Sequence, residues 1–327
     1  MIDESSEPSG PQEQEQVPDA GAVDEEKKEL EEVLEKHRKA GKILAKVADD
    51  SKRMIIVGEG LLDITESIEK MIRDNGVEPA FPVNISLNEF AAHYTPEADC
   101  KKTLGEKDLV KIDMGVHVDG YIADMAYTVD LSGEQGKLVE AAEEALNAGI
   151  AEIKAGVQIS KISEAIHAAF EKHGVKPIEN LTGHKLLQYI LHPGVSIPNV
   201  RGNYEYTLSE NEVFAIEPFG TNGAGHVVDT DQVEIFSLSN IGNVRMRETR
   251  RILNFIQEKY NLLPFAERWL AAEFKSKLLL RSSLRELMVL GLITPYPVLR
   301  DRDKGMVAQA EHTVIVTNDG CEITTKL

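Results

Sequence analysis

The 327-residue sequence has little cysteine and no long apolar run, and both absences exclude classes of protein. Its two cysteines, Cys100 and Cys321, are too few for a disulfide framework or a four-thiolate zinc site, and they are typical of a reducing compartment. Any bound metal must therefore be held by histidine and carboxylate side chains. The sequence has no run of about 18 apolar residues and no basic-then-apolar leader, so we predict a cytoplasmic protein with no membrane partner.

Positive charge is also scarce, because 36 basic residues face 55 acidic ones and give a formal net charge of -19. Broad binding to a phosphate backbone needs Lys and Arg, so we expect no nucleic-acid partner. Nine of the acids and no base lie in residues 1–26, a segment that has few large apolar side chains. Such a segment cannot offset its ordering entropy by burial, which predicts a disordered acidic tail over residues 1–26. A solubilising role is favoured for this tail over that of a partner-binding arm.

The chain contains an internal repeat. Residues 64–79 align with residues 162–177, and each copy is an amphipathic helical pattern that ends at a glycine, Gly76 or Gly174, with a proline shortly after. A further helical pattern precedes each copy, over about 25–49 and about 134–154. Two copies are too few for a solenoid. The repeat therefore predicts one core built from two related halves with a cleft between them.

Strand patterns follow each copy of the repeat. Residues 109–116 and 121–131 flank Asp119-Gly120, a strong signal for a two-residue hairpin turn. Residues 213–217 and 307–316 are further predicted strands, and residues 245–291 are strongly helical in pattern. The sequence thus predicts an α+β protein that carries a helical insertion.

Two aspartates fall on one face of the predicted hairpin. With a two-residue turn, Asp113 lies opposite Ala126, and Asp124 becomes its diagonal neighbour, about 7 to 8 Å away between backbones. Two like charges among apolar neighbours are unfavourable unless something positive lies between them. A pair of metal ions would meet this demand. The alternative is that both aspartates lie at a solvated edge of the sheet.

Three more side chains favour the metal hypothesis. His184 follows a glycine-containing turn, Glu217 ends one apolar strand, and Glu311 interrupts another. One histidine with four carboxylates is a hard, oxygen-rich donor set that suits a pair of Mn, Fe, Co or Zn ions. Two such ions a few Å apart can activate a water molecule for the hydrolysis of an amide bond.

The order of these residues resembles that of the type II methionine aminopeptidases, the archaeal and eukaryotic class. The resemblance runs from about residue 29 to the end. It rests on His93-Tyr-Thr-Pro96, Lys111-Ile-Asp113, Asp124 eleven positions later, Gly183-His184, Ala215-Ile-Glu217-Pro-Phe219 and Gln309-Ala-Glu311-His-Thr313. One departure is Ala310, where the family usually has a bulky aromatic side chain.

The resemblance implies the pita-bread fold, whose two pseudo-symmetric halves agree with the repeat. It also implies the helical insertion that is typical of the type II class. The catalytic domain would comprise residues 27–233 and 299–327, and the inserted helical subdomain would comprise residues 234–298. The implied cofactor is two divalent metal ions per chain, of Co, Mn, Fe, Zn or Ni. The implied ligands are Asp113 on one ion, Asp124 and Glu311 between both ions, and His184 and Glu217 on the other.

The resemblance also implies which residues meet the substrate. His93 and His192 would contact the substrate near the scissile bond and stabilise the transition state, and Glu217 is a candidate proton shuttle. The methionine side chain would bind against Phe81, Leu191, Phe219 and Tyr296. His226 and His312 lie close to the proposed site strands, and either could support the ligands.

The implied activity is hydrolysis of the first peptide bond, which removes the initiator methionine from nascent polypeptide N-termini that carry a small second residue. The expected enzyme is a cytoplasmic monomer, with the ribosome as a candidate partner. A proline-specific peptidase of the same fold would use the same five ligand types, but His93-Tyr-Thr-Pro96 and the helical insertion argue against it. A catalytically inactive relative that binds protein or RNA would have lost ligands, and here all five are present.

Overall fold

The computed structural model describes residues 20–327. Residues 1–19 of the predicted acidic tail lie outside this range, whereas residues 20–26 belong to the first helix, α1 (Ala20–Ser51). The helix thus begins before the apolar periodicity does, because extending a helix costs far less than nucleating one. Within the described range, no helix combines the length and the apolar character that crossing a membrane requires.

The first half of the molecule is a three-stranded antiparallel sheet packed against α1 and α2. Apolar residues at helical spacing on these two helices form one core with the sheet, and Leu44, Ile68 and Ile112 are fully buried in it. The sheet order is β1-β3-β4. The elements are η1 (Lys52–Met54), α2 (Leu61–Asp74), β1 (Glu78–Leu87), β3 (Leu109–Val118) and β4 (Tyr121–Asp130).

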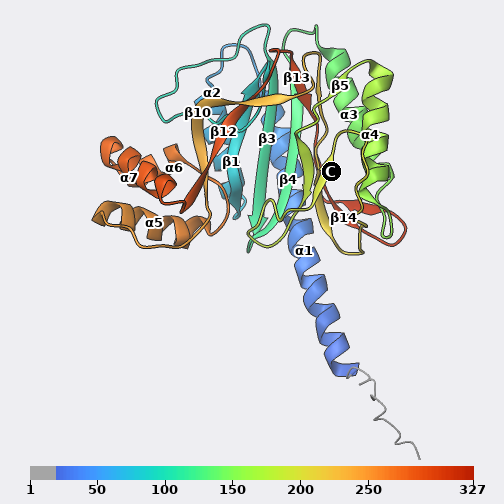
Figure 1. Ribbon diagram of the computed structural model, residues 1–327, viewed down its shortest axis with the longest axis horizontal. Coiled ribbons are helices and arrows are strands. Elements are labelled where there is room, and N and C mark those ends of the chain that lie inside the picture. The colour runs from blue at the N-terminus through green and yellow to red at the C-terminus, as the bar shows by residue number, and fades with distance from the viewer. Residues whose placement is uncertain (1–19) are drawn as a thin grey trace, which may run out of the picture.

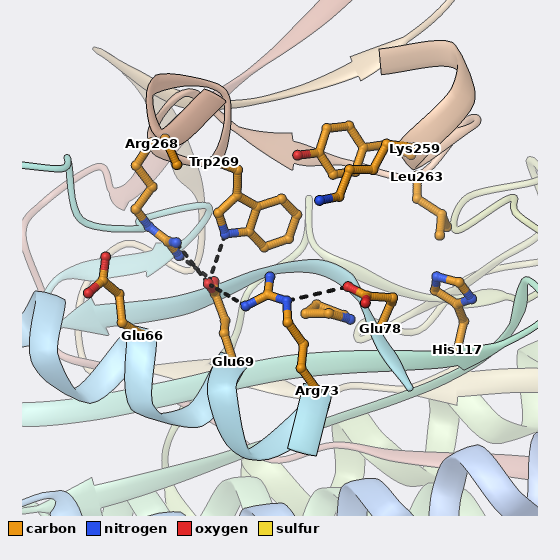
Figure 2. A pocket seen from close by; sticks show the side chains of 12 residues that line it. Glu66, Glu69, Arg73, Glu78, His117, Lys259, Leu263, Arg268 and Trp269 are labelled. Carbon is orange, nitrogen blue, oxygen red and sulfur yellow. Dashed lines mark hydrogen bonds and ion pairs between the residues drawn. The ribbon is translucent and has the colours of Figure 1, made fainter. Parts of the chain in front are cut away.

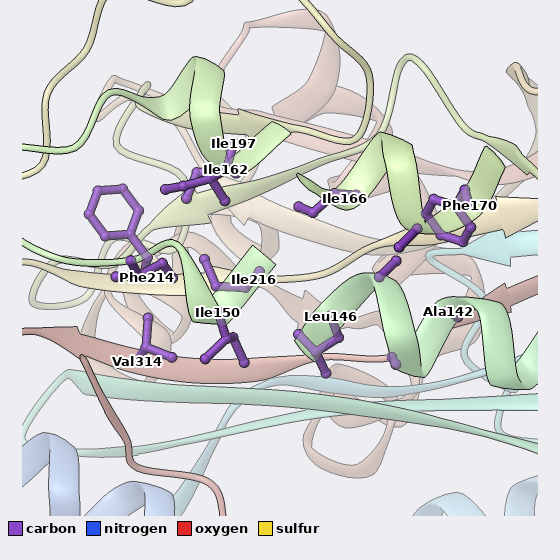
Figure 3. Close-up of a cluster of buried hydrophobic side chains, with 14 of the residues drawn as sticks. Ala142, Leu146, Ile150, Ile162, Ile166, Phe170, Ile197, Phe214, Ile216 and Val314 are labelled. Atoms are coloured by element: carbon purple, nitrogen blue, oxygen red, sulfur yellow. The ribbon is translucent and has the colours of Figure 1, made fainter. Parts of the chain in front are cut away.

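The second half repeats the pair of helices and packs them on two small sheets. The α2 and α4 helices begin at equivalent positions of the repeat, Leu61 and Ile159, and each is followed by a glycine with positive φ, Gly76 at 75° and Gly174 at 61°. Figure 3 shows the core of this half, where Phe170 of α4 and Phe214 are fully buried. Its helices are α3 (Gly136–Ala151) and α4 (Ile159–His173).

The two sheets of the second half have the orders β15-β14-β8-β6-β7 and β13-β9-β5. Their strands are β5 (Lys176–Pro177), β6 (Thr182–Lys185), β7 (Ser196–Pro198), β8 (Val213–Ile216), β9 (Phe219–Thr221), β13 (Val307–Gln309), β14 (His312–Val316) and β15 (Cys321–Ile323). Helices and sheets thus occur together in both halves, as expected for the predicted α+β class.

The insertion is a helical cluster on a two-stranded stem. In Figure 1 its helices lie at one end of the molecule and α3 and α4 lie at the other, with β1, β3 and β4 between them. The stem strands pair from Val227 with Asp301 to Leu238 with Ile293, so positions 234 and 298 fall inside the stem. The sheet order is β11-β10-β12-β2. The elements are β2 (Phe90–Ala92), β10 (Val227–Leu238), α5 (Arg247–Tyr260), β11 (Phe265–Ala266), α6 (Glu267–Glu273), α7 (Lys277–Val289) and β12 (Ile293–Asp301).

The C-terminal segment packs against the first helix. The Arg38 guanidinium of α1 donates from Nε to Glu322 Oε2 of β15 at 2.9 Å. A Cβ atom at Gly41 would lie 2.4 Å from the carbonyl oxygen of Thr324, a distance that real Cβ atoms do not show. Only glycine therefore permits this close approach of the chain's end to α1.

Candidate metal centre

The β3–β4 hairpin has the predicted register. Asp113 pairs with Ala126, and Gly115 pairs with Asp124, two positions along the ladder. Because side chains alternate between the faces of a sheet, Asp113 and Asp124 lie on the same face. The Asp124 side chain is buried.

Glu217 and Glu311 both stand where a strand is interrupted. The predicted strand over residues 307–316 is in fact two strands, β13 and β14, with Glu311 between them. The facing strand is interrupted in the same way between β8 and β9, at Glu217-Pro218. Proline has no N–H group and cannot continue a ladder, and the Glu311 N–H donates instead to the carbonyl of Ala126 at 2.9 Å. The two facing breaks therefore bring both glutamates to the β3–β4 hairpin.

The structure brings the five predicted ligands together in one cavity of about 300 Å³. Asp124, His184 and Glu311 each offer a ligand atom, and these three atoms lie within 4.8 Å of one another. His184 Nε2 lies 3.2 Å from Glu217 Oε1 and 3.7 Å from Asp124 Oδ2. This spacing is that of side chains around a shared centre.

Gln309 links the remaining ligand to the cluster. Its Nε2 lies 3.4 Å from Asp113 Oδ2 and 3.3 Å from Glu311 Oε2, so one amide group donates weakly to two carboxylates. The sequence reasoning did not assign Gln309 to the site. The available signal was its position two residues before Glu311, the spacing that puts two side chains on one face of a strand.

The cluster lacks internal positive charge. Among the described residues, no Lys or Arg lines the cavity. Within that same part of the chain, Asp113 Oδ1, Asp124 Oδ1 and Glu311 Oε1 are buried without a hydrogen-bond partner. Buried anions in this state are strongly unfavourable. The donor set therefore fits hard divalent cations, whose charge would satisfy these oxygen atoms.

Burial shifts the ionisation of every ligand in this cluster. Burial, with the neighbouring Glu217 carboxylate, raises the pKa of Asp113 to about 7. Burial also raises the pKa of Asp124, Glu217 and Glu311 well above the usual carboxyl range, and neighbouring carboxylates add to this effect for Asp124 and Glu311. Burial lowers the pKa of His184 to about 4, so its imidazole is neutral at pH 7 and its lone pair is available to a metal.

The two predicted substrate histidines line the same cavity. The His192 and His184 ring centroids are 4.3 Å apart, and burial lowers the pKa of His192 to about 3. His93 Nδ1 lies 3.1 Å from the carbonyl oxygen of Pro297. A carbonyl only accepts, so Nδ1 carries the proton, and burial lowers the pKa of the ring. His93 is therefore neutral, with the lone pair on Nε2.

The predicted methionine pocket lies in this cavity as well. Phe81, Leu191 and Phe219 are buried in its lining, and Tyr296 completes it. A Cβ atom at Gly115 would lie 2.3 Å from Phe81 Cε1, so glycine at this position leaves room for the ring. Sequence reasoning missed other lining residues that have no distinctive local pattern: Asn84, Ala92, Asn180, Leu181, Thr182, Ile235, Pro264 and Leu299.

The remaining residues singled out from the sequence lie apart from the cavity lining. His226 Nδ1 is 2.8 Å from Glu179 Oε1, and His312 Nδ1 is 2.8 Å from Thr325 Oγ1. Neither histidine lines the cavity. Ala310 is buried in the core of the second half, where its small side chain packs among apolar neighbours.

Comparisons with known proteins find relatives over most of the chain. The profile of metallopeptidase family M24 matches residues 35–318. A methionine aminopeptidase from Archaeoglobus fulgidus is 46% identical over 90% of this chain and 99% of its own length. The structure of a thermophilic Arx1 aligns with a TM-score of 0.79 at 19% identity, over 90% of this chain and 91% of that one. A methionine aminopeptidase structure from Rickettsia prowazekii aligns with a TM-score of 0.65 at 23% identity, over 90% and 97% of the two chains. The predicted pita-bread fold is thereby confirmed.

Proposed function

The chain belongs to metallopeptidase family M24, and we propose that it is a methionine aminopeptidase that removes the initiator methionine from nascent polypeptides. The observation that carries this proposal is the single cavity in which five metal-ligand side chains, two histidines and an apolar wall converge. The identity to methionine aminopeptidases over 90% of the chain supports it. A small second residue is the expected preference.

The ligand roles follow the type II pattern. By that pattern, Asp113 would hold one ion, His184 and Glu217 would hold the other, and Asp124 and Glu311 would serve both. When bound, the two divalent ions supply Lewis acidity and a nucleophilic water at neutral pH. The four carboxylates would stay ionised beside these ions despite their burial, since a nearby cation lowers a carboxyl pKa.

The side chains around the metal ligands orient the substrate. With its proton on Nδ1, His93 presents a lone pair at Nε2 that can accept a hydrogen bond from the substrate's peptide N–H. His192 is a second neutral imidazole next to His184, suited to a further contact near the scissile bond. The buried Glu217 carboxylate can accept a proton from the attacking water and return it to the departing amine.

The apolar wall supplies the side-chain specificity. Phe81, Leu191, Phe219 and Tyr296 present apolar and aromatic surface beside the ligands. Thioether sulfur contacts favourably with aromatic rings, and an unbranched side chain fits such a slot. Charged first residues would lose hydration in this pocket without gaining a partner.

We infer the remaining properties from the resemblance of this chain to the type II class. The catalytic domain comprises residues 27–233 and 299–327, and the subdomain over residues 234–298 is inserted into it. The enzyme acts as a cytoplasmic monomer on nascent N-termini, with the ribosome as a candidate partner and no nucleic-acid substrate.

A peptide assay with defined metals tests the proposal. Protein loaded with Co or Mn should release methionine from Met-Gly-type peptides and should leave Xaa-Pro dipeptides intact. Asp113→Ala should abolish both metal loading and activity, whereas His93→Ala should abolish most activity and keep the metal content of the wild type. Absence of methionine release with every divalent metal would contradict the proposal, and cleavage of Xaa-Pro dipeptides would favour a proline-specific peptidase.

A further inference from the structure

A second cavity, of about 520 Å³, lies between α2 and the inserted subdomain. Figure 2 shows its centre, where Arg268 and Trp269 of α6 both point to Glu69 of α2. Arg268 donates from one terminal nitrogen to Glu69 Oε2 at 2.8 Å and from the other to Oε1, and Trp269 Nε1 donates to Oε2 at 2.8 Å. Glu69 and Arg268 are 2% and 7% exposed, so this ion pair is buried.

The buried pair continues into a closed ring of hydrogen bonds. Arg268 also donates to Thr95 Oγ1 at 3.1 Å, and the Thr95 hydroxyl donates to the Val83 carbonyl at 2.9 Å. The Val83 N–H donates to Glu69 Oε1 at 3.3 Å, which closes the ring. Three neighbouring segments, α2, β1 and the segment after β2, are thereby joined to α6 of the insertion, and Arg268 follows Thr95 by 173 residues.

Thr95 lies two residues after His93, whose backbone is strained. The φ angle of His93 is 65°, in the left-handed region that residues with a side chain rarely adopt. Such a conformation persists only where neighbouring contacts fix it. His93 therefore needs contacts that hold its ring and contacts that hold the neighbouring residues of the chain.

Both anchors of His93 come from the insertion. On one side, the His93 ring meets Pro297 and Tyr296 of β12, with Nδ1 3.1 Å from the Pro297 carbonyl and the two ring centroids of His93 and Tyr296 5.3 Å apart. On the other side, Thr95 is held by Arg268 of α6. The Tyr94 carbonyl between them accepts from Ile85 of β1 at 2.8 Å, which aligns the segment along that strand.

We propose that Arg268 and Glu69 are positioning residues that hold His93 in its strained conformation through Thr95. The inserted subdomain is then a working part of the catalytic site, because its α6 helix fixes the histidine that meets the substrate. This inference rests on the role proposed above for His93. Neither Arg268 nor Glu69 lines the metal cavity, so they act through Thr95 and not on the substrate.

Thr95→Val is the sharpest test, since it breaks the ring at one hydroxyl and leaves the Arg268–Glu69 pair in place. Thr95→Ser keeps a hydroxyl and serves as the conservative variant. Thr249→Val is a matched control, because Thr249 is another fully buried threonine whose hydroxyl binds Ser283 and Glu286 inside the insertion. All variants would be studied as full-length, metal-loaded protein, below their measured unfolding temperatures.

Hydrogen–deuterium exchange measures how firmly the segment around His93 and Thr95 is held, independently of activity. Thr95→Val should raise the exchange of amides over residues 91–96 at least about fivefold, because each lost anchor raises the population of open states. Thr95→Ser should stay close to the wild type, and Thr249→Val should raise exchange only within residues 247–290. Unchanged exchange over residues 91–96 in Thr95→Val, or an equal rise there in Thr249→Val, would overturn the proposal.

A double-mutant cycle on methionine release then identifies the route. Thr95→Val should lower kcat about tenfold with KM within about twofold of the wild type, as expected when a transition-state contact is misplaced. In a His93→Ala background, the same change should have no further effect on kcat. An equal loss in both backgrounds would show a general structural role and would overturn the proposal. If the wild type releases no methionine, the proposed function fails, and the exchange comparison still decides whether the ring holds the segment.

Discussion

Two groups of buried carboxylates in this protein are satisfied in opposite ways. Glu69 accepts four hydrogen bonds from protein groups, two of them from the permanently charged guanidinium of Arg268. In the metal centre, Asp113 and Glu311 share the weak amide donor of Gln309. Three buried carboxylate oxygen atoms of this centre have no hydrogen-bond partner among the described residues.

The comparison separates a structural joint from a binding site. A buried anion that has an internal cation and a full set of hydrogen-bond donors adds little further cost to the free energy of folding. It can therefore fix one segment to another. A buried cluster of anions without an internal cation must be neutralised by protons or by an added cation. The missing positive charge, more than the carboxylates themselves, is therefore what marks the cavity as a metal centre.

Removal of the metal should produce the largest effect, since only one of the two groups depends on an external cation. Chelation followed by desalting should lower methionine release by about 10³-fold or more, and Mn or Co should restore it. Exchange of the amides around Glu69 and Arg268 should not change. Full activity in protein shown to be metal-free by elemental analysis would contradict the comparison.

Breaking the internal pair should produce a large loss of stability. Arg268→Met leaves the Glu69 carboxylate buried without its cation, and we expect the free energy of unfolding to fall by about 3 to 5 kcal/mol. Lys70→Met, which removes an exposed ion pair with Asp74 on the same helix, is the control and should leave stability nearly unchanged. Denaturant unfolding measures both, and a loss below about 1 kcal/mol in Arg268→Met would show that the pair is not a joint.

A smaller effect should appear in the pH dependence of the metal-free protein. Because the pKa of Asp113 is raised to about 7 from its ordinary value of 3.8, folding favours the protonated carboxyl. The contribution of the protonated Asp113 carboxyl to the free energy of unfolding is fully present below pH 3.8. This contribution is lost as the pH rises through about 7.

Metal-free Asp113→Asn should therefore gain stability relative to metal-free wild type by about 2 to 3 kcal/mol between pH 5 and pH 8.5. Comparing the two proteins cancels the titration of the groups that do not interact with Asp113, whereas Asp124 and Glu311 feel its charge directly. Thermal or denaturant unfolding at each pH provides the measurement. A stability gap that does not change with pH would mean that Asp113 is not a strained anion in the empty site.

Part of the geometry of the candidate metal centre was predictable from local signals. The two-residue turn at Asp119-Gly120 determines the hairpin register, and this register places Asp113 and Asp124 on one face. The recurrence of the pattern of residues 64–79 at residues 162–177 predicted the two related halves. These features depend on residues that are close in sequence or on patterns that occur twice.

The rest depends on contacts that no local pattern encodes. The interruption of the predicted strand at Glu311 is matched by Glu217-Pro218 on a facing strand about ninety residues away, so residues 307–316 alone read as one strand. The ring through Glu69, Val83, Thr95 and Arg268 joins four segments. Single polar residues on amphipathic helices are usually solvated. The start of α1 before residue 26 reflects propagation of the helix beyond the N-terminal end of its apolar pattern.

The close approach of Gly41 to Thr324 also bears on the order in which the parts of the protein are made. The first helix receives part of its packing surface from Glu322 and Thr324, and Glu322 follows its partner Arg38 by 284 residues. A growing chain therefore cannot complete the cover of α1, or the cluster that includes Glu311, before residues 311–324 have been synthesised. The proposed enzyme would thus lack part of its candidate metal site during most of its own synthesis.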